Sequence, residues 1–200
     1  MNKYMGFYEM KGINFPTVPW RLFTPETVLD NGLLWSVRMA VENSKDLNLP
    51  RAIGVNAEEA MQQGRGFLNN YQGKGIVICY PYFIAQKSGV LDIDSRRTVI
   101  EAVDRDLWNL VTYGRKNVSI IFPIEPNAEN EVQYFGDRDF LENDEIKELL
   151  GYGAVLRGRF RGELSEGGSI LAEWSYAYNT DLRHEPIGER YLVFYELRGL

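Results

Sequence analysis

Short runs of β-branched and aromatic residues, separated by turn residues, dominate the middle of the chain. Their length of about four to eight residues and their composition are typical of strands. The runs are GIVICYPYF, SGVLDID, RTVIEAV and NVSIIF, at 75–83, 88–94, 97–103 and 117–122. Because they fall within about fifty residues, we expect them to form one sheet.

Helices are predicted before and after these strands in the sequence. Asn56, followed three residues later by Glu59, resembles a capping box, so 57–71 should be helical despite Gly64 and Gly66. Apolar positions at helical spacing between Asp137 and Leu164 predict one helix, bent or split at the glycines at 151 and 153.

The N-terminal part shows weaker patterns. Two prolines in 15–20 (FPTVPW) favour extended or turn backbone, so residues 1–24 are expected to form a packed lead-in without a helix. Thr24 followed by Pro25 predicts a short helix to about Leu29, ended by Asn31-Gly32. The whole pattern favours an α+β domain.

Charges interrupt several apolar strands, and these charges are the main functional candidates. The strand at 33–40 (LLWSVRMA) carries a charge, as do RTVIEAV and the last two strands, SILAEWSYA at 169–177 and YLVFYELR at 191–198. The residues are Arg38, Glu101, Glu173, Glu196 and Arg198. Ionised groups are costly in a strand that packs on both faces, so these groups should pair with one another or bind a ligand. Alternating strands whose charges face water are the other interpretation.

Composition narrows the choice of function. The 200 residues, 44% hydrophobic and 25% charged, fit one soluble domain, in which lobes at about 1–74 and 75–200 are allowed. A net charge of −6 argues against a nucleic-acid surface, although Arg157, Arg159 and Arg161 could form a local basic patch. One cysteine and one histidine exclude an intrachain disulfide and a Cys/His zinc site. We expect a cytoplasmic protein without a signal peptide or membrane span.

Four other features favour structural interpretations. His184 lies in a polar loop and is expected at the surface, and Cys79 lies in an apolar strand and is expected to be a buried, inert thiol. Gly64-Arg65-Gly66 and Gly73-Lys74-Gly75 do not fit a phosphate-binding loop. The acidic run 142–144 is typical of a solvated helix start.

Six segments, taken in order, resemble the nucleotide-binding domain of pyruvate phosphate dikinase and phosphoenolpyruvate synthase. KGINFPTVPWRLFTPET is similar to G-L-P-V-P-P-G-F-V-I-T, and SVRMA to V-R-S-S-A. IVICYPYF with SGVLDID resembles V-I-V-Q-E-M-V leading into S-G-V-x-F, and VIEAVDRDLWNLVTYG resembles the glutamate-bearing segment that ends in V-V-x-G. ILAEWSYA and YLVFYELR resemble D-I-E-W-A and L-Y-I-L-Q-A-R-P. Each match is weak alone, and the shared order carries the resemblance.

This resemblance implies an ATP-grasp-like α+β fold with two small lobes, mostly antiparallel sheets and a few flanking helices. It implies that Arg38 contacts the nucleotide phosphates, that Glu101 corresponds to the glutamate of its segment, and that Glu196 and Arg198 lie at the phosphates. It further implies that Glu173 helps to hold Mg²⁺, and Glu196 could supply a second carboxylate. Guanidiniums for phosphate and carboxylate oxygens for magnesium are the groups that Mg-ATP requires.

The chain also departs from the family pattern. The G-G-K-G segment with its lysine is missing, and Leu171 stands where the family has its first metal-binding aspartate. Leucine cannot ligate magnesium. Glu196 replaces a glutamine, Met39 a serine and Asn109 an acidic residue, and the phosphohistidine and phosphoenolpyruvate-binding domains are absent from this sequence.

Three functions remain open from the sequence. The first is an ATP- and magnesium-binding module, a phosphotransferase or kinase if active, working with a protein that carries phosphohistidine or phosphoenolpyruvate-binding domains. The second is a catalytically degenerate binding or regulatory subunit with the same fold. The third is a small-molecule sensor with an aromatic-rich cleft, although an aromatic content of 13% more often reflects core packing.

Overall fold

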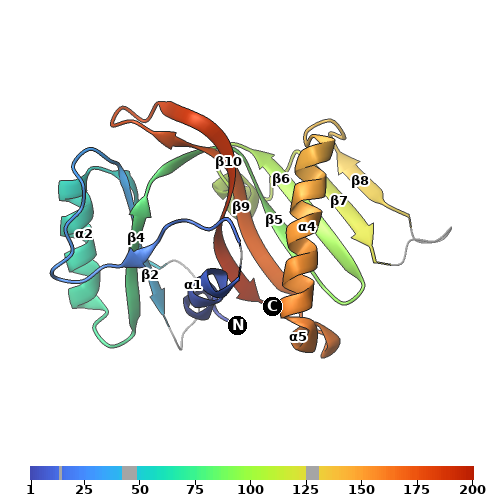
Figure 1. Cartoon of the computed structure of the whole chain (residues 1–200), viewed down its shortest axis with the longest axis horizontal. Helices are drawn as coiled ribbons and strands as arrows, with labels where there is room; N and C mark the ends of the chain where they lie inside the picture. The colour runs from blue at the N-terminus through green and yellow to red at the C-terminus, as the bar shows by residue number, and fades with distance from the viewer. Residues whose placement is uncertain (14, 42–48, 125–130) are drawn as a thin grey trace. The chain divides into compact units, whose positions relative to one another are not determined.

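The computed structural model describes residues 1–13, 15–41, 49–124 and 131–200 and has an α+β fold (Figure 1). Its helices are α1 (Lys3–Gly12), α2 (Ala57–Asn70), α3 (Trp108–Tyr113), α4 (Asn143–Arg159) and α5 (Arg161–Ser165). Its strands are β1 (Arg21–Leu22), β2 (Trp35–Val41), β3 (Arg51–Val55), β4 (Gly75–Pro81), β5 (Phe83–Ile93), β6 (Arg97–Asp104), β7 (Val118–Pro123), β8 (Gln133–Gly136), β9 (Ile170–Thr180) and β10 (Pro186–Gly199).

The chain divides into two compact units, which we describe separately. Unit 1 comprises Met1, 85–176 and 194–200, and unit 2 comprises 2–84 and 177–193. The boundaries between the units fall within β5, β9 and β10. A four-stranded sheet has the order β1-β4-β2-β3, and a six-stranded sheet has the order β10-β9-β5-β6-β7-β8.

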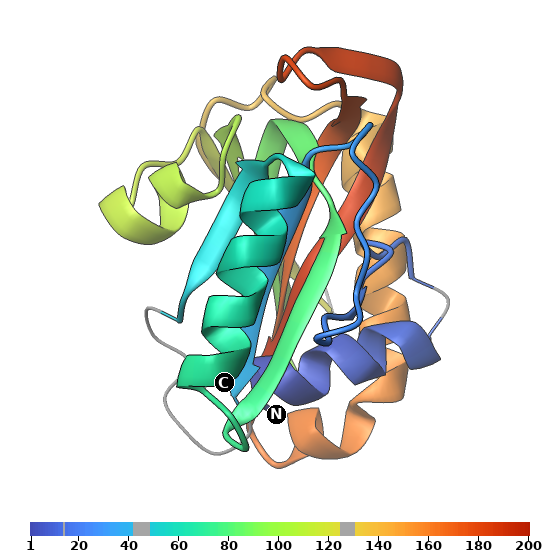
Figure 2. The same ribbon diagram turned by 90° about the vertical axis from the view of Figure 1, so that its left-hand side faces the viewer.

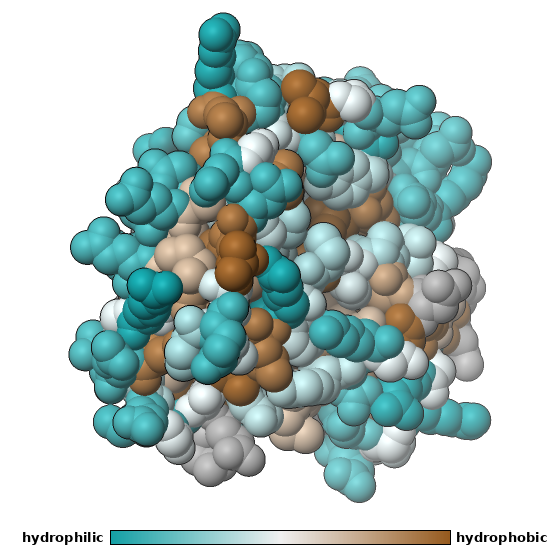
Figure 3. Space-filling view, turned by 60° about the vertical axis from the view of Figure 1, so that its left-hand side comes forward, coloured by the Kyte–Doolittle hydropathy of each residue, from teal (hydrophilic) through white to brown (hydrophobic). Residues whose placement is uncertain are grey.

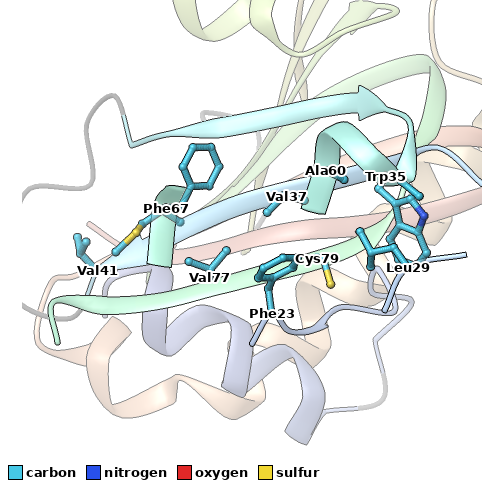
Figure 4. Packing of buried hydrophobic residues seen from close by; sticks show 11 residues of the cluster. Phe23, Leu29, Trp35, Val37, Val41, Ala60, Phe67, Val77 and Cys79 are labelled. Atoms are coloured by element: carbon cyan, nitrogen blue, oxygen red, sulfur yellow. The ribbon is translucent and has the colours of Figure 1, made fainter. Parts of the chain in front are cut away.

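The core of unit 2 lies between α2 and one face of the four-stranded sheet. Figure 2 shows α2 lying along the sheet, and Figure 4 shows the side chains packed beneath it. Alternate residues of β2 join this core together with Phe23 and Phe67. Because side chains alternate along a strand, Ser36, Arg38 and Ala40 belong to the opposite face of the sheet.

The predicted start of the second helix is confirmed. The Asn56 side chain accepts a hydrogen bond from the Glu59 backbone N–H at 2.9 Å, and α2 runs from Ala57 to Asn70. Gly64 lies against the Phe23 ring, where a Cβ would come within 2.5 Å of Cζ. The helix therefore contains this glycine because only a residue without a side chain leaves room for the ring.

In unit 1, α4 packs on one face of the six-stranded sheet. The nearest atoms to a Cβ at Gly153 belong to Leu91, Ile93 and Thr98, on β5 and β6. Helix α4 begins with a capping box between Glu142 and Glu145, which agrees with the acidic helix start expected from the sequence.

The expected break in α4 lies elsewhere than predicted. The helix continues through both glycines, at 151 and 153, and the interruption comes at Phe160, between α4 and α5. Phe160 is buried, with backbone angles outside the helical region (φ −106°, ψ 26°), so the chain turns where this ring enters the core. A Cβ at Gly151 would meet no atom within 4 Å, and one at Gly153 would make only ordinary contacts at 3.7 Å or more, so the packing of α4 does not require either glycine.

Three other predictions are wrong. Residues 3–12 form α1, because the Asn2 side chain caps Met5 N–H and Phe7 and Met10 are buried. Thr24 forms only a turn, in which Thr27 Oγ1 accepts from the Thr24 N–H. β4 does not join the sheet of the next three strands but pairs with β2, because Trp35 through Val41 match Pro81 through Gly75 in antiparallel register.

Candidate functional site

Arg38 lies in unit 2 beside a second arginine. It is half-buried on β2. In the strand register it lies opposite Arg51 of β3 on one side and Ile78 of β4 on the other. Residues paired across antiparallel strands point to the same face, so both guanidinium groups leave the sheet on the face opposite α2.

Glu101 lies in unit 1, on β6, directly across from Val90 of β5 and Ser119 of β7. Its carboxylate forms an ion pair with Lys116 and accepts a hydrogen bond from Ser119 Oγ at 3.4 Å. The carboxylate is only partly exposed. Glu101 thus has partners within unit 1, and a ligand at this position would share the carboxylate with Lys116.

Glu173 lies on β9 and is 8% exposed. Two residues further along, Ser175 Oγ is 2.8 Å from Ser88 Oγ of β5, which places these two side chains on one face of the sheet. By the alternation of strands, Glu173 shares that face with Ser175, and Val90 shares it with Ser88. Since Glu101 is paired with Val90, Glu101 and Glu173 project from the same face of the six-stranded sheet.

The other side of β9 confirms this alternation. Trp174, between Glu173 and Ser175, packs over Gly89, where a Cβ would come within 2.4 Å of the indole. Trp174 and Tyr176 form an edge-to-face pair, and the Tyr176 hydroxyl donates to Glu148 of α4 at 2.8 Å. The even-numbered residues of this segment therefore face α4, and the odd-numbered ones face away from it.

Glu196 and Arg198 lie on β10, the strand next to β9. Glu196 is 2% exposed and Arg198 is half-buried. Among the described residues, none accepts a hydrogen bond from Arg198 Nε, although this nitrogen is shielded from solvent. Because Glu196 is buried, its strand does not simply turn this charge to water. Phe194 contacts Tyr152 of α4, and the Tyr195 hydroxyl lies 3.5 Å from Ser175 Oγ. Strand alternation therefore directs Glu196 to the α4 side of the sheet, opposite the face of Glu101 and Glu173.

Asp92 is a further acidic residue of this face that the sequence analysis did not single out. It lies on the same face of β5 as Ser88 and Val90, four and two residues away, and it is directly opposite Val99 of β6. Burial raises its pKa, although a hydrogen bond with Ser169 opposes this effect. The signal was present in the sequence, because SGVLDID sets a charge into an apolar strand as the other candidates do. Ser88 contacts Ser175 and Asp92 forms a hydrogen bond with Ser169, so β5 and β9 run antiparallel here.

The five residues chosen from the sequence are therefore divided between the two units. Glu101 and Glu173 share one face in unit 1, with Glu196 and Arg198 on the strand beside Glu173, whereas Arg38 belongs to unit 2. Among the described residues, no group of three or more His, Cys, Asp or Glu side chains is arranged to hold a metal ion.

The residues given structural interpretations behave as expected. Cys79 is a free, fully buried thiol, and burial raises its pKa. His184 is exposed in the turn between β9 and β10, where its ring contacts Tyr82 edge-on. Within the described ranges, no helix is both long enough and apolar enough to cross a membrane.

A scan against protein-family models and a search of curated proteins both find nothing that matches this chain. Functional interpretation therefore depends on the geometry described above and on the resemblance of the sequence segments.

Proposed function

We propose that this chain is an ATP-binding module that takes its nucleotide as a complex with Mg²⁺, with an ATP-grasp-like arrangement. The observation that carries the proposal is the shared face of Glu101 and Glu173, with the buried Glu196 and the half-buried Arg198 on the neighbouring strand. Carboxylates and a guanidinium held in buried strands destabilise the fold unless each has a hydrogen-bonded partner or a ligand. Glu101 and Glu173 offer oxygen ligands for a metal on one face, and Arg198 offers donors for phosphate.

Magnesium usually binds one or two protein carboxylates and completes its octahedral coordination with phosphate oxygens and water. Glu173 is the proposed metal ligand, and Glu101 and Arg198 are proposed to contact the nucleotide. The resemblance also assigns Glu196 to the metal, but strand alternation directs this carboxylate to the α4 side of the sheet, away from Glu173. The resemblance adds Arg38 of unit 2 as a phosphate contact.

If the module is active, we propose that it transfers a phosphoryl group to a partner protein that carries a phosphohistidine or phosphoenolpyruvate-binding domain. Phosphoryl transfer needs little more from a protein than positioning and neutralisation of charge. The residues proposed here are of the types that provide both.

The test is thermal unfolding of the whole chain during titration with ATP and Mg²⁺. A ligand at 100 times its dissociation constant stabilises the folded state by about 2.7 kcal/mol. Glu173→Gln should abolish the magnesium-dependent part of this shift. Arg198→Met and, separately, Arg38→Ala should weaken nucleotide binding about tenfold or more. Glu166→Gln, at an exposed position of unit 1, is the matched control and should bind as the parent does.

Leu171 supports an alternative function, that of a degenerate binding or regulatory subunit. It stands at the position where the dikinase and synthase domain has its first metal-binding aspartate. A degenerate subunit would keep the fold without binding a nucleotide. Absence of any shift at millimolar ATP and magnesium would reject the proposed function, and a change in partner association on Arg38→Ala would then support the alternative.

A further inference from the structure

A cavity of about 330 Å³ lies in unit 2, and its lining includes none of the residues assigned to the nucleotide. One wall comes from the proline-rich segment 16–19, and another comes from Pro81 and Phe83 around the junction of β4 and β5. Asn179 of β9 and 191–193 of β10 complete the lining. Figure 3 shows hydrophobic groups, drawn in brown, lying among polar side chains on the side of the molecule that it presents.

The lining of this cavity is preformed. Pro16, Pro19 and Pro81 restrict their own backbone, and Val18 and Val193 are buried. A wall of this kind loses little conformational entropy when a ligand binds, because its residues are already ordered.

The lining contains no Asp, Glu, Lys or Arg, and its polar groups are few. The Tyr191 hydroxyl donates a hydrogen bond to Asn179 Oδ1 at 3.0 Å. Burial raises the pKa of Tyr191, so this phenol is neutral at physiological pH. Since Oδ1 is engaged, the Nδ2 hydrogens are the part of the Asn179 amide that can donate to a ligand, and among the described residues none accepts from them.

The volume limits the size of the ligand. An apolar cavity of about 150 Å³ accommodates one benzene ring. The cavity of unit 2 therefore has room for a fused pair of rings, and its apolar walls with a few polar groups match the usual character of small-molecule sites.

We propose that this cavity binds an uncharged, fused-ring aromatic molecule that carries a hydrogen-bond acceptor at its edge, with the acceptor directed to Asn179. The site is separate from the proposed nucleotide site and does not depend on it. It would let unit 2 respond to a small molecule whether or not ATP binds.

Quinoline is a suitable probe, because it is a neutral fused bicycle with one ring nitrogen as acceptor. We would titrate it into the whole ¹⁵N-labelled chain and follow backbone amide shifts. Saturable shifts at Val18, Phe83 and Val193 are expected. Naphthalene, which lacks the acceptor, should bind about five- to tenfold more weakly.

Variants link these shifts to the cavity. Thr17→Phe should fill it and abolish quinoline binding. Asn179→Ala should weaken quinoline about five- to tenfold and leave naphthalene unchanged. Asn69→Ala, at an exposed asparagine of α2 in the same unit, is the matched control and should change neither. Unfolding curves establish that each variant is folded.

Three outcomes would overturn the proposal. These are the absence of saturable shifts at millimolar quinoline, unchanged binding in a folded Thr17→Phe variant, and equal binding of naphthalene and quinoline. Competition between ATP and quinoline would also reject a separate site, since it would assign the cavity to the nucleotide. A failure of ATP binding alone leaves the quinoline result unaffected.

Discussion

The Lys87 ammonium lies 2.8 Å from Glu145 Oε2, and this carboxylate is only 3% exposed. The same oxygen accepts the Glu142 backbone N–H at the start of α4, also at 2.8 Å. Lys87 belongs to β5, so the ion pair joins the six-stranded sheet to the first turn of the helix that covers it. One carboxylate therefore both caps the helix and holds it to the sheet.

Replacing Lys87 with methionine should destabilise the chain by about 3 kcal/mol, because it leaves a buried carboxylate without its cation. Chemical denaturation measures this change. The matched control is Lys147→Met, which breaks the pair with Asp144 at 3.0 Å, where both side chains are largely exposed. An exposed pair contributes about 0.2–1 kcal/mol. Equal losses in the two variants would show that the Lys87 pair behaves as a surface pair.

Two glycines of α2 should respond in opposite ways to alanine. Gly64→Ala would force a methyl group against the buried Phe23 ring, at a cost of about 1–3 kcal/mol. Gly66→Ala meets no atom within 4 Å and should stabilise the helix by up to about 1 kcal/mol. Denaturation curves of the two variants give the comparison.

The double variant Phe23→Leu/Gly64→Ala tests whether the cost of Gly64→Ala comes from a steric clash with the Phe23 ring. A smaller side chain at position 23 makes room for the methyl group, so the two changes together should cost less than their sum. Strict additivity would contradict a steric origin of the Gly64 effect.

The sequence predicted those elements whose causes are local. The Asn56 cap and the strands with β-branched runs depend on neighbouring residues, and both are confirmed. Helix α1 was missed because its apolar pattern is weak and its stability comes from burial of Phe7 and Met10. β4 was assigned to the wrong sheet because its partner, β2, is more than thirty residues away in the chain.

The same limit applies to the candidate site. A charge in an apolar strand identified Glu101 and Glu173, but the sequence could not show that they share a face, because this depends on the register of β5 with its two neighbours. Asp92 carries the same signal and was overlooked because no resembling motif pointed to it. The metal and nucleotide roles remain predictions.

Asp92 and Asp94 should give opposite pH dependences of stability, although they are two residues apart. Burial raises the pKa of Asp92, so the folded state binds its proton more tightly than the unfolded state, where aspartate titrates near 3.9. Its ionisation therefore lowers stability as the pH rises through this folded-state pKa. Asp92→Asn should have a higher Tm than the parent at pH 7, and the difference should vanish below about pH 4.

Asp94 provides the comparison. Burial opposes its ionisation, but the Arg96 and Arg97 backbone N–H groups and the Arg97 guanidinium outweigh burial and lower its pKa. The stability that this provides is present above the unfolded-state pKa and is lost as the pH falls through the folded-state value. Asp94→Asn should therefore lower the Tm at pH 7 and converge with the parent at low pH. Parallel profiles for the two variants would refute these assignments.

Arg157 near the end of α4 holds the hairpin between β5 and β6. Its guanidinium donates to the backbone carbonyls of Asp94 and Arg97 and to Thr98 Oγ1, the last at 2.9 Å. Lysine has a single ammonium and cannot span three acceptors in one plane, so Arg157→Lys should destabilise the chain by about 1–2 kcal/mol. The rate of hydrogen exchange at the backbone amides of 94–98 should increase in the same variant.

The control for this change is Arg161→Lys, at an exposed position at the start of α5, which should alter stability by less than about 0.5 kcal/mol. The pair also tests the basic segment that the sequence suggested as an anion surface. Arg157 is committed to the hairpin through these three acceptors, so its loss should appear as faster unfolding of unit 1. Loss of anion binding with unchanged stability in Arg157→Lys would show instead that this guanidinium serves a ligand.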